Sequence, residues 1–323
     1  MPKLAFAALA AATLALVPAT EALAQGWPNK TIKFVVPQPA GGSNDAMGRA
    51  VGEQLSKQLG QPIVVDNRPG ASGAVGMEVV ASSPADGYIY VIASDSVALQ
   101  PILRKGLKWN VERDFVPVTM FGAQPIVVAV PAASPFKSMK DVIAAAKASP
   151  GKVGYATSGQ GSIQHLAGEL LAQMAGIDLL HIPYKGGGQA ITDLVGGQVP
   201  VAVLGLAAVL PHAKTGRVRI LAVTTKARSP AVPDVPSLDE AGVPGYDVRQ
   251  WAGLMAPAAT PPDVQAKLQK EIATALATPA LRERIEKLGF EVTGTAGADF
   301  AAYLSRDRAR WSKVIAERKL QLD

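Results

Sequence analysis

Ser162 and His165 are the first residues whose types and spacing suggest chemistry, because a serine beside a histidine can act as a nucleophile with its base. The surrounding sequence, Gly159-Gln160-Gly161-Ser162-Ile163, lacks the glycine that follows the serine in a nucleophile elbow. An i, i+3 pair on one helix rarely has a productive Ser–His geometry, and no obvious acid follows. The sequence therefore disfavours a hydrolase, and we expect no enzyme.

Metal and cofactor chemistry is not indicated either. The three histidines, His165, His181 and His212, do not have the spacing of metal ligands, and the chain contains no cysteine. Gly186-Gly187-Gly188 is not followed by the sequence of a P-loop, and Gly41-Gly42 does not form a dinucleotide fingerprint. We predict no metal and no cofactor, and we expect His165 to donate a hydrogen bond within the site or to a nearby carbonyl.

Two glycine-containing loops suggest anion binding instead. The segments 37–45 and 155–165 each join a short apolar run to an amphipathic helical pattern. The first N–H groups of such a helix lack intrahelical partners and lie at the positive end of its dipole, so a carboxylate or phosphate fits there. Two other interpretations stay open: Ser162 could simply cap its own helix, and Asp45 could simply favour its helix dipole.

The elements that must position these loops alternate between strand and helix. Polar or glycine-rich groups follow the predicted strands, and ligands bind at this end of the strands in a parallel α/β sheet. Residues 104–115 are expected to be a surface loop, and the proline-containing segment 228–245 an irregular excursion. Strands are predicted at 32–36, 62–66, 88–93, 116–120, 125–130, 151–156, 179–183, 199–204, 218–224, 253–256 and 290–293, with a final helix at 300–320.

Length and composition indicate a globular protein of two domains. The chain has 323 residues, 48% of them apolar and 18% charged. The net charge is +6, but lysine and arginine are scattered along the chain. The densest basic group, Arg306, Arg308, Arg310 and Lys313, is interleaved with Asp307 on the final predicted helix, which indicates a solvated face. We therefore expect no nucleic-acid partner.

Residues 1–24 have the pattern of a cleavable signal peptide. Lys3 precedes an apolar run over 4–17, and Ala22-Leu23-Ala24 forms a small-x-small cleavage site. The apolar run is too short to span a bilayer comfortably. We predict cleavage after Ala24 and a soluble product exported to the periplasm.

From Trp27 onward the chain resembles the substrate-binding receptors of tripartite tricarboxylate transporters, the TctC or Bug family. Several motifs in the same order carry the resemblance. They are Trp27-Pro28, 39–45 (PAGGSND), 67–71 (NRPGA), 85–88 (ADGY), 158–162 (SGQGS) with His165, 183–186 (PYKG), 221–223 (LAV), 228–230 (RSP), 233–236 (PDVP), 240–242 (EAG), 244–246 (PGY) and 251–253 (WAG).

The resemblance implies a fold and a function. The expected fold is α/β and two-domain, of the type II periplasmic-binding-protein or Venus flytrap kind, with a ligand cleft between the domains. Domain 1 would comprise 25–125 plus 250–323, and domain 2 would comprise 126–249. The protein would be a monomer that captures a small organic carboxylate by closure and delivers it to a membrane permease. A periplasmic sensor that signals to a membrane histidine kinase is the alternative.

The resemblance also implies a binding site made mainly of loop backbone and ordered water. One departure is that Gly205-Leu206-Ala207 stands where many relatives carry an acidic or amide residue. We expect the far end of the cleft to be less polar for this reason, which favours a carboxylate with an apolar or aromatic body over an amino acid. The implied ligand-binding residues are Ala40, Gly41, Gly42, Ser43 and Asp45 from domain 1, and Thr157, Ser158, Gly161, Ser162, His165, Lys185 and Gly186 from domain 2.

Overall fold

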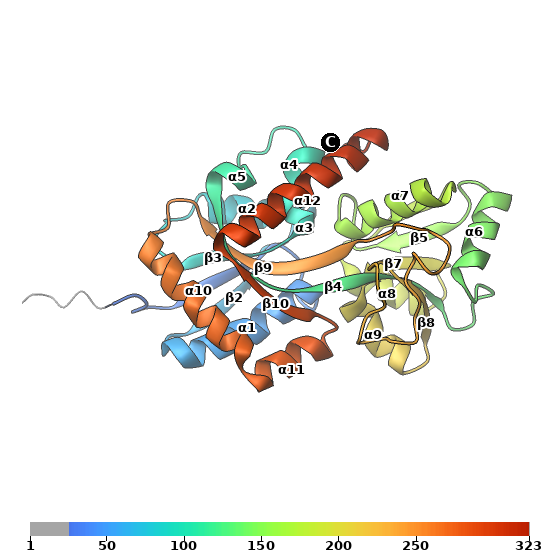
Figure 1. Ribbon diagram of the computed structural model, residues 1–323. Helices are drawn as coiled ribbons and strands as arrows, with labels where there is room; N and C mark the ends of the chain where they lie inside the picture. Colours follow the sequence, from blue (N-terminus) through green and yellow to red (C-terminus); the bar gives the residue numbers. More distant parts are fainter. Residues whose placement is uncertain (1–25, 323) are drawn as a thin grey trace, which may run out of the picture.

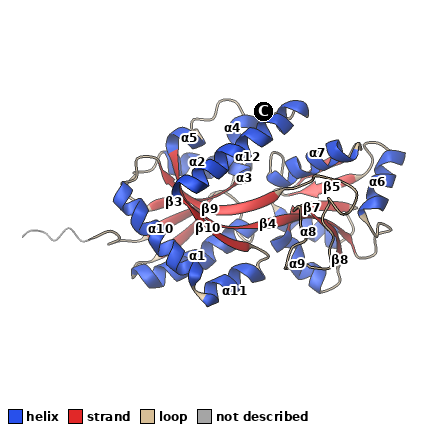
Figure 2. Cartoon of the chain, in the orientation of Figure 1, coloured by secondary structure: helices blue, strands red, loops and turns tan. Residues whose placement is uncertain are grey.

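A single ten-stranded sheet runs through both lobes of the molecule and is shared by them through one long strand, β4 (Phe115–Pro131) (Figure 1). The computed structural model describes residues 26–322, so the expected signal peptide lies outside the described residues. Helices cover both faces of the sheet in each lobe (Figure 2). The strand order is β2-β1-β3-β9-β4-β7-β5-β6, and β10 and β8 also pair with β4.

The first lobe contains three parallel strands that lead toward the second lobe. Strands β1 (Ile32–Val36), β2 (Ile63–Asn67) and β3 (Ile89–Ser94) are parallel, whereas β9 (Arg249–Pro257) and β10 (Glu291–Ala296) are antiparallel to their neighbours. The helices of this lobe are α1 (Ser43–Leu59), η1 (Ala71–Gly73), α2 (Ala74–Ala81), α3 (Asp95–Ala98), α4 (Gln100–Leu103), α5 (Val111–Asp114), α10 (Pro262–Ala277), α11 (Pro279–Lys287) and most of α12 (Gly297–Glu317).

Burial on both faces explains the apolar run of β1. Phe34 and Val36 pack in the core beneath α1 and α10, while Val35 packs in a separate core on the other face of the sheet. A central parallel strand that is covered on both sides has no solvent face, so its sequence does not alternate.

The second lobe repeats this arrangement. Strands β5 (Gly154–Thr157), β6 (Leu180–Pro183) and β7 (Val201–Gly205) are parallel, and β8 (Val218–Val223) pairs antiparallel with β4. The helices of this lobe are α6 (Met139–Ala148), α7 (Ile163–Ala175), α8 (Gly187–Val195) and α9 (Leu206–Lys214).

Two of the predicted strands are joined, which corrects the sequence analysis. Residues 116–120 and 125–130 belong to the continuous strand β4, and the expected short strand at 253–256 is the middle of the nine-residue β9. Gly122 lies between the two predicted segments, and a Cβ there would lie 2.6 Å from the Glu291 carbonyl oxygen, so the glycine permits close strand pairing. Strand β4 pairs with β9 up to Pro125 and with β7 from Ile126, so it passes directly from one lobe to the other.

The expected surface loop at 104–115 is also corrected in part. It contains the helical turn α5, and Trp109 and Phe115 are buried with their rings perpendicular, 6.1 Å apart. The basic face expected on the last helix is not fully solvated, because the Arg308 side chain is only 16% exposed and pairs with Glu112 at 2.6 Å. Amphipathic periodicity did not reveal these contacts because it does not record tertiary packing, and Arg308 and Glu112 are far apart in the chain.

Helix α12 belongs to both lobes. Phe300 and Leu304 pack in a core of the first lobe, with Trp251. Farther along the helix, Trp311 and Ile315 pack in the core that also contains the residues of α7 in the second lobe. The helix therefore connects the lobes independently of strands β4 and β9.

Candidate functional site

The loop between β1 and α1 is held by a side chain from the first turn of the helix. Gly41 has φ +84°, and its N–H donates to Oδ2 of Asp45 at 3.0 Å. Asp45 is buried and also accepts hydrogen bonds from Arg49 and Asn67. Helix α1 begins at Gly42, which has no side chain to cap it. Its first-turn N–H groups therefore have no N-cap side-chain partner.

The ionisation of Asp45 follows from these contacts. Burial works against its charged form, but the hydrogen bonds from Arg49, Gly41 and Asn67 outweigh burial and hold the pKa of the Asp45 carboxyl below its ordinary value. An ionised Asp45 can accept the Gly41 N–H and fix the loop.

The loop between β5 and α7 has the same design. Gly161 has φ +73°, and its N–H donates to Nδ1 of His165 at 3.1 Å. Ser162 is the N-cap of α7: its Oγ accepts from the His165 N–H and donates to the Gly159 carbonyl at 2.7 Å. The capping role that was one sequence interpretation is thus present. The serine hydroxyl does not donate to the His165 ring, so the residues do not form a nucleophile–base pair.

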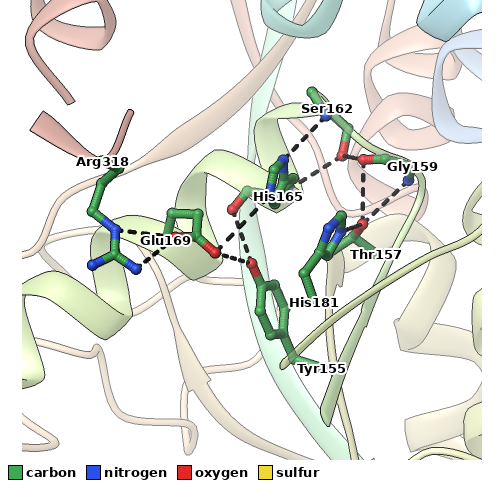
Figure 3. A network of polar contacts seen from close by, with 9 residues as sticks. Tyr155, Thr157, Gly159, Ser162, His165, Glu169, His181 and Arg318 are labelled. Carbon is green, nitrogen blue, oxygen red and sulfur yellow. Dashed lines mark hydrogen bonds and ion pairs between the residues drawn. The ribbon is translucent and has the colours of Figure 1, made fainter. Parts of the chain in front are cut away.

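A stacked histidine pair lies beneath this loop (Figure 3). The His165 and His181 rings are nearly parallel, with centroids 3.8 Å apart, and His181 Nε2 lies 2.8 Å from Thr157 Oγ1. Burial lowers the pKa of both histidines, and the neighbouring His165 adds to the effect on His181, whose pKa falls to about 3. Nδ1 of His165 accepts the Gly161 N–H, so a hydrogen bond that His165 donates must come from Nε2, which lies 3.9 Å from Oε1 of Glu169.

A buried carboxylate joins this pair to the end of the chain. Glu169 accepts hydrogen bonds from Tyr155 Oη at 2.8 Å and from Arg318 Nη2 at 2.7 Å (Figure 3). Burial, and then the charge of Glu169, raise the pKa of the Tyr155 hydroxyl, which remains a donor. Arg318 follows directly after α12, so a residue at the far end of the sequence supports the helix that carries the β5–α7 loop.

Direct contacts bring the loops of the two lobes together. Ser72 Oγ donates to the Gln160 carbonyl at 2.8 Å, and the Ile163 N–H donates to Ser96 Oγ at 3.1 Å. A Cβ on Gly186 would lie 3.7 Å from Cγ of Pro39, so the β6–α8 loop faces the β1–α1 loop. Sequence reasoning did not name Ser72 or Ser96, although both follow strands at the carboxyl end where ligands bind.

The other expected site residues occupy several environments. Thr157 accepts the Gly159 N–H, and Ser158 donates to Gln164. Lys185 is exposed, and its backbone N–H donates to Gln189. The structure brings the loop of Ala40, Gly41, Gly42, Ser43 and Asp45 to the side of the second lobe formed by Thr157, Ser158, Gly161, Ser162, His165 and Gly186, with Lys185 at the edge.

The end of β7 is more polar than its sequence indicated. Gly205 has no side chain, but a Cβ there would lie 2.6 Å from Oε1 of Gln250 and 2.9 Å from Nε2 of Gln124. Two amides from the strands that connect the lobes therefore occupy the place that the expectation left apolar. No motif indicated these glutamines, because each stands alone in its strand sequence.

Neither metal ligation nor a membrane span is indicated for residues 26–322. Among them there is no group of three or more histidine or acidic side chains arranged to hold a metal ion. None of their helices combines the length and apolar character needed to cross a membrane.

Solved structures show what class of protein has this fold. A Rhodopseudomonas palustris protein, Rpa4515 solved with adipate, is 32% identical, with TM-score 0.88, and the match covers 91% of this chain and 99% of that one. MatC of the same organism, solved with bound malate, is 29% identical, with TM-score 0.84 and coverage of 89% and 99%. The expected two-domain α/β fold of periplasmic binding proteins is confirmed.

Sequence comparison then identifies the family. A UPF0065 protein of Bordetella bronchiseptica is 40% identical over 309 residues, covering 95% of this chain and 91% of that protein. BugT of Bordetella pertussis is 36% identical over 296 residues, covering 91% of each. The family model for the tripartite tricarboxylate transporter family receptor matches residues 47–320. The chain belongs to this family, which is a family of solute-binding receptors and not a class of enzymes.

Proposed function

We propose that this protein is a periplasmic receptor that traps a small organic carboxylate between its two lobes without chemical conversion. The observation that carries the proposal is the uncapped start of α1 at Gly42, beside a loop held open by the Gly41–Asp45 hydrogen bond. Helix N-termini of this kind bind carboxylates through backbone N–H groups and the helix dipole. The adipate and malate bound by structural relatives are ligands of the same chemical class.

The carboxylate binds to main-chain amides from both lobes. Gly42 and Ser43 contribute from the first lobe, and the loops containing Ser158 and Gly186 contribute from the second. Helix α8 begins at Gly186, which, like Gly42, offers no side-chain cap. Helices α1 and α8 belong to different lobes, and each has a glycine at its N-cap. Neither N-cap side chain can accept from the first-turn N–H groups, so these groups are left for a ligand.

The two lobes close about the point where the connecting strand β4 changes its strand partner. Strand β4 changes partner between Pro125 and Ile126, opposite the start of β9 at Arg249. These positions support a first domain of 25–125 plus 250–323 and a second of 126–249. The hydrogen bonds from Ser72 to Gln160 and from Ile163 to Ser96 are contacts that form as the domains close.

Family membership supports the later steps of the proposal. The mature protein, cleaved after Ala24, is a periplasmic monomer and delivers its ligand to the membrane permease of a tripartite tricarboxylate transporter. The Ser162 hydroxyl donates to the Gly159 carbonyl and not to the stacked His165 ring, so the two residues do not form a nucleophile with its base, which supports binding without catalysis.

Ligand binding tests the proposed function. The purified mature chain is screened by thermal shift with mono-, di- and tricarboxylates that include adipate and malate, and positive ligands are measured by calorimetry. A ligand that binds only the native state raises the melting temperature. We expect at least one carboxylate with a dissociation constant of about 1 μM, or about −8 kcal/mol. Absence of binding across the series, or release of a converted product detected by mass spectrometry, contradicts the proposal.

A further inference from the structure

Three glutamine amides form a continuous chain where the lobes join. Gln124 lies on β4, Gln250 on β9 and Gln164 in the first turn of α7, and their exposed fractions are 1%, 5% and 5%. Oε1 of Gln250 accepts hydrogen bonds from Gln124 Nε2 at 3.2 Å and from Gln164 Nε2 at 3.0 Å. We call these three residues the amide chain.

A backbone donor determines which way the amide chain points. The Ala207 N–H donates to Oε1 of Gln124 at 2.8 Å, and a backbone N–H cannot accept a hydrogen bond. Gln124 must therefore direct its Nε2 toward Gln250, which in turn must present its oxygen. At the other end of the amide chain, the Ser158 hydroxyl donates to Oε1 of Gln164 at 2.8 Å. Gln164 therefore also directs its Nε2 toward Gln250.

This order leaves the Gln250 amide nitrogen without a protein acceptor. All three carbonyl oxygens of the amide chain accept hydrogen bonds, and the Gln124 and Gln164 nitrogens donate one each. Within residues 26–322, Nε2 of Gln250 makes no hydrogen bond, and it is not among the polar atoms sealed from solvent. An amide nitrogen carries two hydrogens, so this group is a donor directed at accessible space.

Gly205 and the neighbouring strands place the amide chain on the ligand side of the second lobe. Gly205 ends β7, and β7 is parallel to β5, so their carboxyl ends share the edge that carries Thr157 and its loop. A side chain at Gly205 would displace the amides, because its Cβ would lie 2.6 Å from Oε1 of Gln250. Gly205 therefore makes room for Gln250.

We propose that Gln250 is a specificity-determining residue that donates to a second acceptor group of the ligand, at the end remote from the start of α1. The favoured ligand then carries a carboxylate at one end and a carboxylate or carbonyl oxygen at the other. This inference rests on the proposed receptor function. The Gln250 amide is held in place by two donors and is neutral. It can therefore donate to an anion without the cost of burying a positively charged side chain beside the strands.

The test compares ligands that differ only at the second end. Straight-chain dicarboxylates from malonate to adipate are measured by calorimetry beside the monocarboxylates of equal length, propionate to hexanoate. The variants are Gln250→Leu, Gln250→Glu and Gly205→Ala, and the matched control is Gln198→Glu, which makes the same change at an exposed position of the second lobe. Thermal unfolding of every variant verifies that it is folded.

Loss of the amide should affect only two-ended ligands. A hydrogen bond to a charged group contributes enough that Gln250→Leu should weaken the best dicarboxylate about ten- to hundredfold. The paired monocarboxylate should change by less than about twofold, because it makes no contact there. Gln250→Glu retains an acceptor for Gln124 and Gln164, so this variant should fold. Its negative charge repels the second carboxylate, so it should weaken dicarboxylate binding more than Gln250→Leu does. Gly205→Ala should weaken dicarboxylate binding to a similar extent as Gln250→Leu.

The outcomes separate this inference from the function on which it rests. If the wild type binds dicarboxylates, and both Gln250→Leu and Gln250→Glu bind them as tightly as the wild type does, Gln250 does not contact the ligand. The receptor function then stands. If Gln250→Leu weakens mono- and dicarboxylates equally, the residue only supports the fold, and the inference is again overturned. A wild type that binds no carboxylate overturns both.

Discussion

At the scale of single residues, the two site loops depend on glycines in the left-handed region. Gly41 and Gly161 each direct an N–H to a side chain four residues later, Asp45 in one lobe and His165 in the other. A residue with a Cβ is strained at such a φ, and a β-branched residue most of all. The repeated geometry makes the two loops rigid supports for the amides that follow them.

Gly41→Val should weaken ligand binding more than Ser162→Ala. The first change strains a backbone with φ +84° and places a side chain where no protein atom lies within 4 Å, in the space we assign to ligand; we expect a loss of tenfold or more. The second removes a helix cap that contributes about 1 kcal/mol. Calorimetry measures affinity, and thermal unfolding measures stability.

Gly60→Val is the matched control for this prediction. Gly60 has φ +65°, also has no atom within 4 Å of a built Cβ, and lies at the opposite end of α1. The Gly60→Val variant should have backbone strain similar to that of Gly41→Val, but its affinity for the ligand should be unchanged. Equal affinity in Gly41→Val and Gly60→Val would remove Gly41 from the site.

The histidine pair predicts that stability falls in acid. In the unfolded chain both histidines take up a proton near pH 6.5, whereas in the folded protein the pKa of His181 is about 3 and that of His165 is lowered. Their contribution to stability is therefore present above pH 6.5 and is lost as the pH falls from 6.5 toward 3. Melting temperatures of the wild type and His181→Gln between pH 4 and 8 test this. The variant should depend less on pH, and parallel profiles would argue against the prediction.

At the scale of elements, α7 is positioned by packing on β5 and by the segment that follows α12. Gly168 lies so close to Tyr155 that a Cβ would be 2.2 Å from its ring, and Tyr155 is fully buried. At the next position of the same helix, Glu169 forms an ion pair with Arg318. Both contacts set the position of the helix whose first turn carries Ser162.

Gly168→Ala should destabilise the protein although alanine favours helices. Overpacking against an immobile ring costs about 1–3 kcal/mol or more, which exceeds the propensity gain of about 1 kcal/mol. Gly188→Ala, inside α8 and with no atom within 4 Å of the new Cβ, is the control and should be neutral or slightly stabilising. Urea unfolding measures both, and equal stability of the two variants would contradict the packing argument.

Arg318→Gln should be costly because it leaves Glu169 buried without its ion-pair partner. The Glu169 side chain is 11% exposed and that of Arg318 30%, so the pair is partly screened, and we expect a loss of about 1–3 kcal/mol. Arg228→Gln removes an exposed pair with Glu240, in which both side chains are nearly half exposed, and should cost less than about 1 kcal/mol. Should denaturant midpoints shift equally, α12 would not support α7 in the manner described.

At the scale of the whole molecule, the lobes are joined by two strands and one helix, and they touch through their loops. Strands β4 and β9 pass between the lobes near the point where β4 changes its strand partner, while α12 packs against both lobes (Figure 1). The contact from Ser72 to Gln160 lies across the lobes and away from these connections. It is a natural reporter of closure.

The absence of cysteine from the sequence allows this contact to be trapped. The double variant Ser72→Cys, Gln160→Cys should form a disulfide more quickly when adipate or malate is bound, because the ligand favours the closed arrangement. The rate is followed by electrophoresis under mild oxidant, with each single variant as the control. A rate independent of every bound carboxylate would show that closure is not coupled to binding.

The sequence by itself determined most elements and the two glycine-containing loops that join a strand to a helix. Apolar runs and helical periodicity depend on neighbours within a few residues, and the helices that follow the two loops formed as predicted. The family motifs likewise indicated the fold that the solved relatives confirm. The assignment of Gly41, Ser162 and the other loop residues to ligand remains a prediction that the experiments above test.

The tertiary structure alone decided how the loops are held and what lies between them. The union of two predicted strands into β4 needed its pairing with β9, and the support of Glu169 needed Arg318, 149 residues away. Gln124 and Gln250 are separated by 126 residues and meet only because the register of β4 against β9 places them opposite each other. A local pattern records what each residue requires of its neighbours in the chain, whereas a buried hydrogen bond between distant residues depends on the folded arrangement of both.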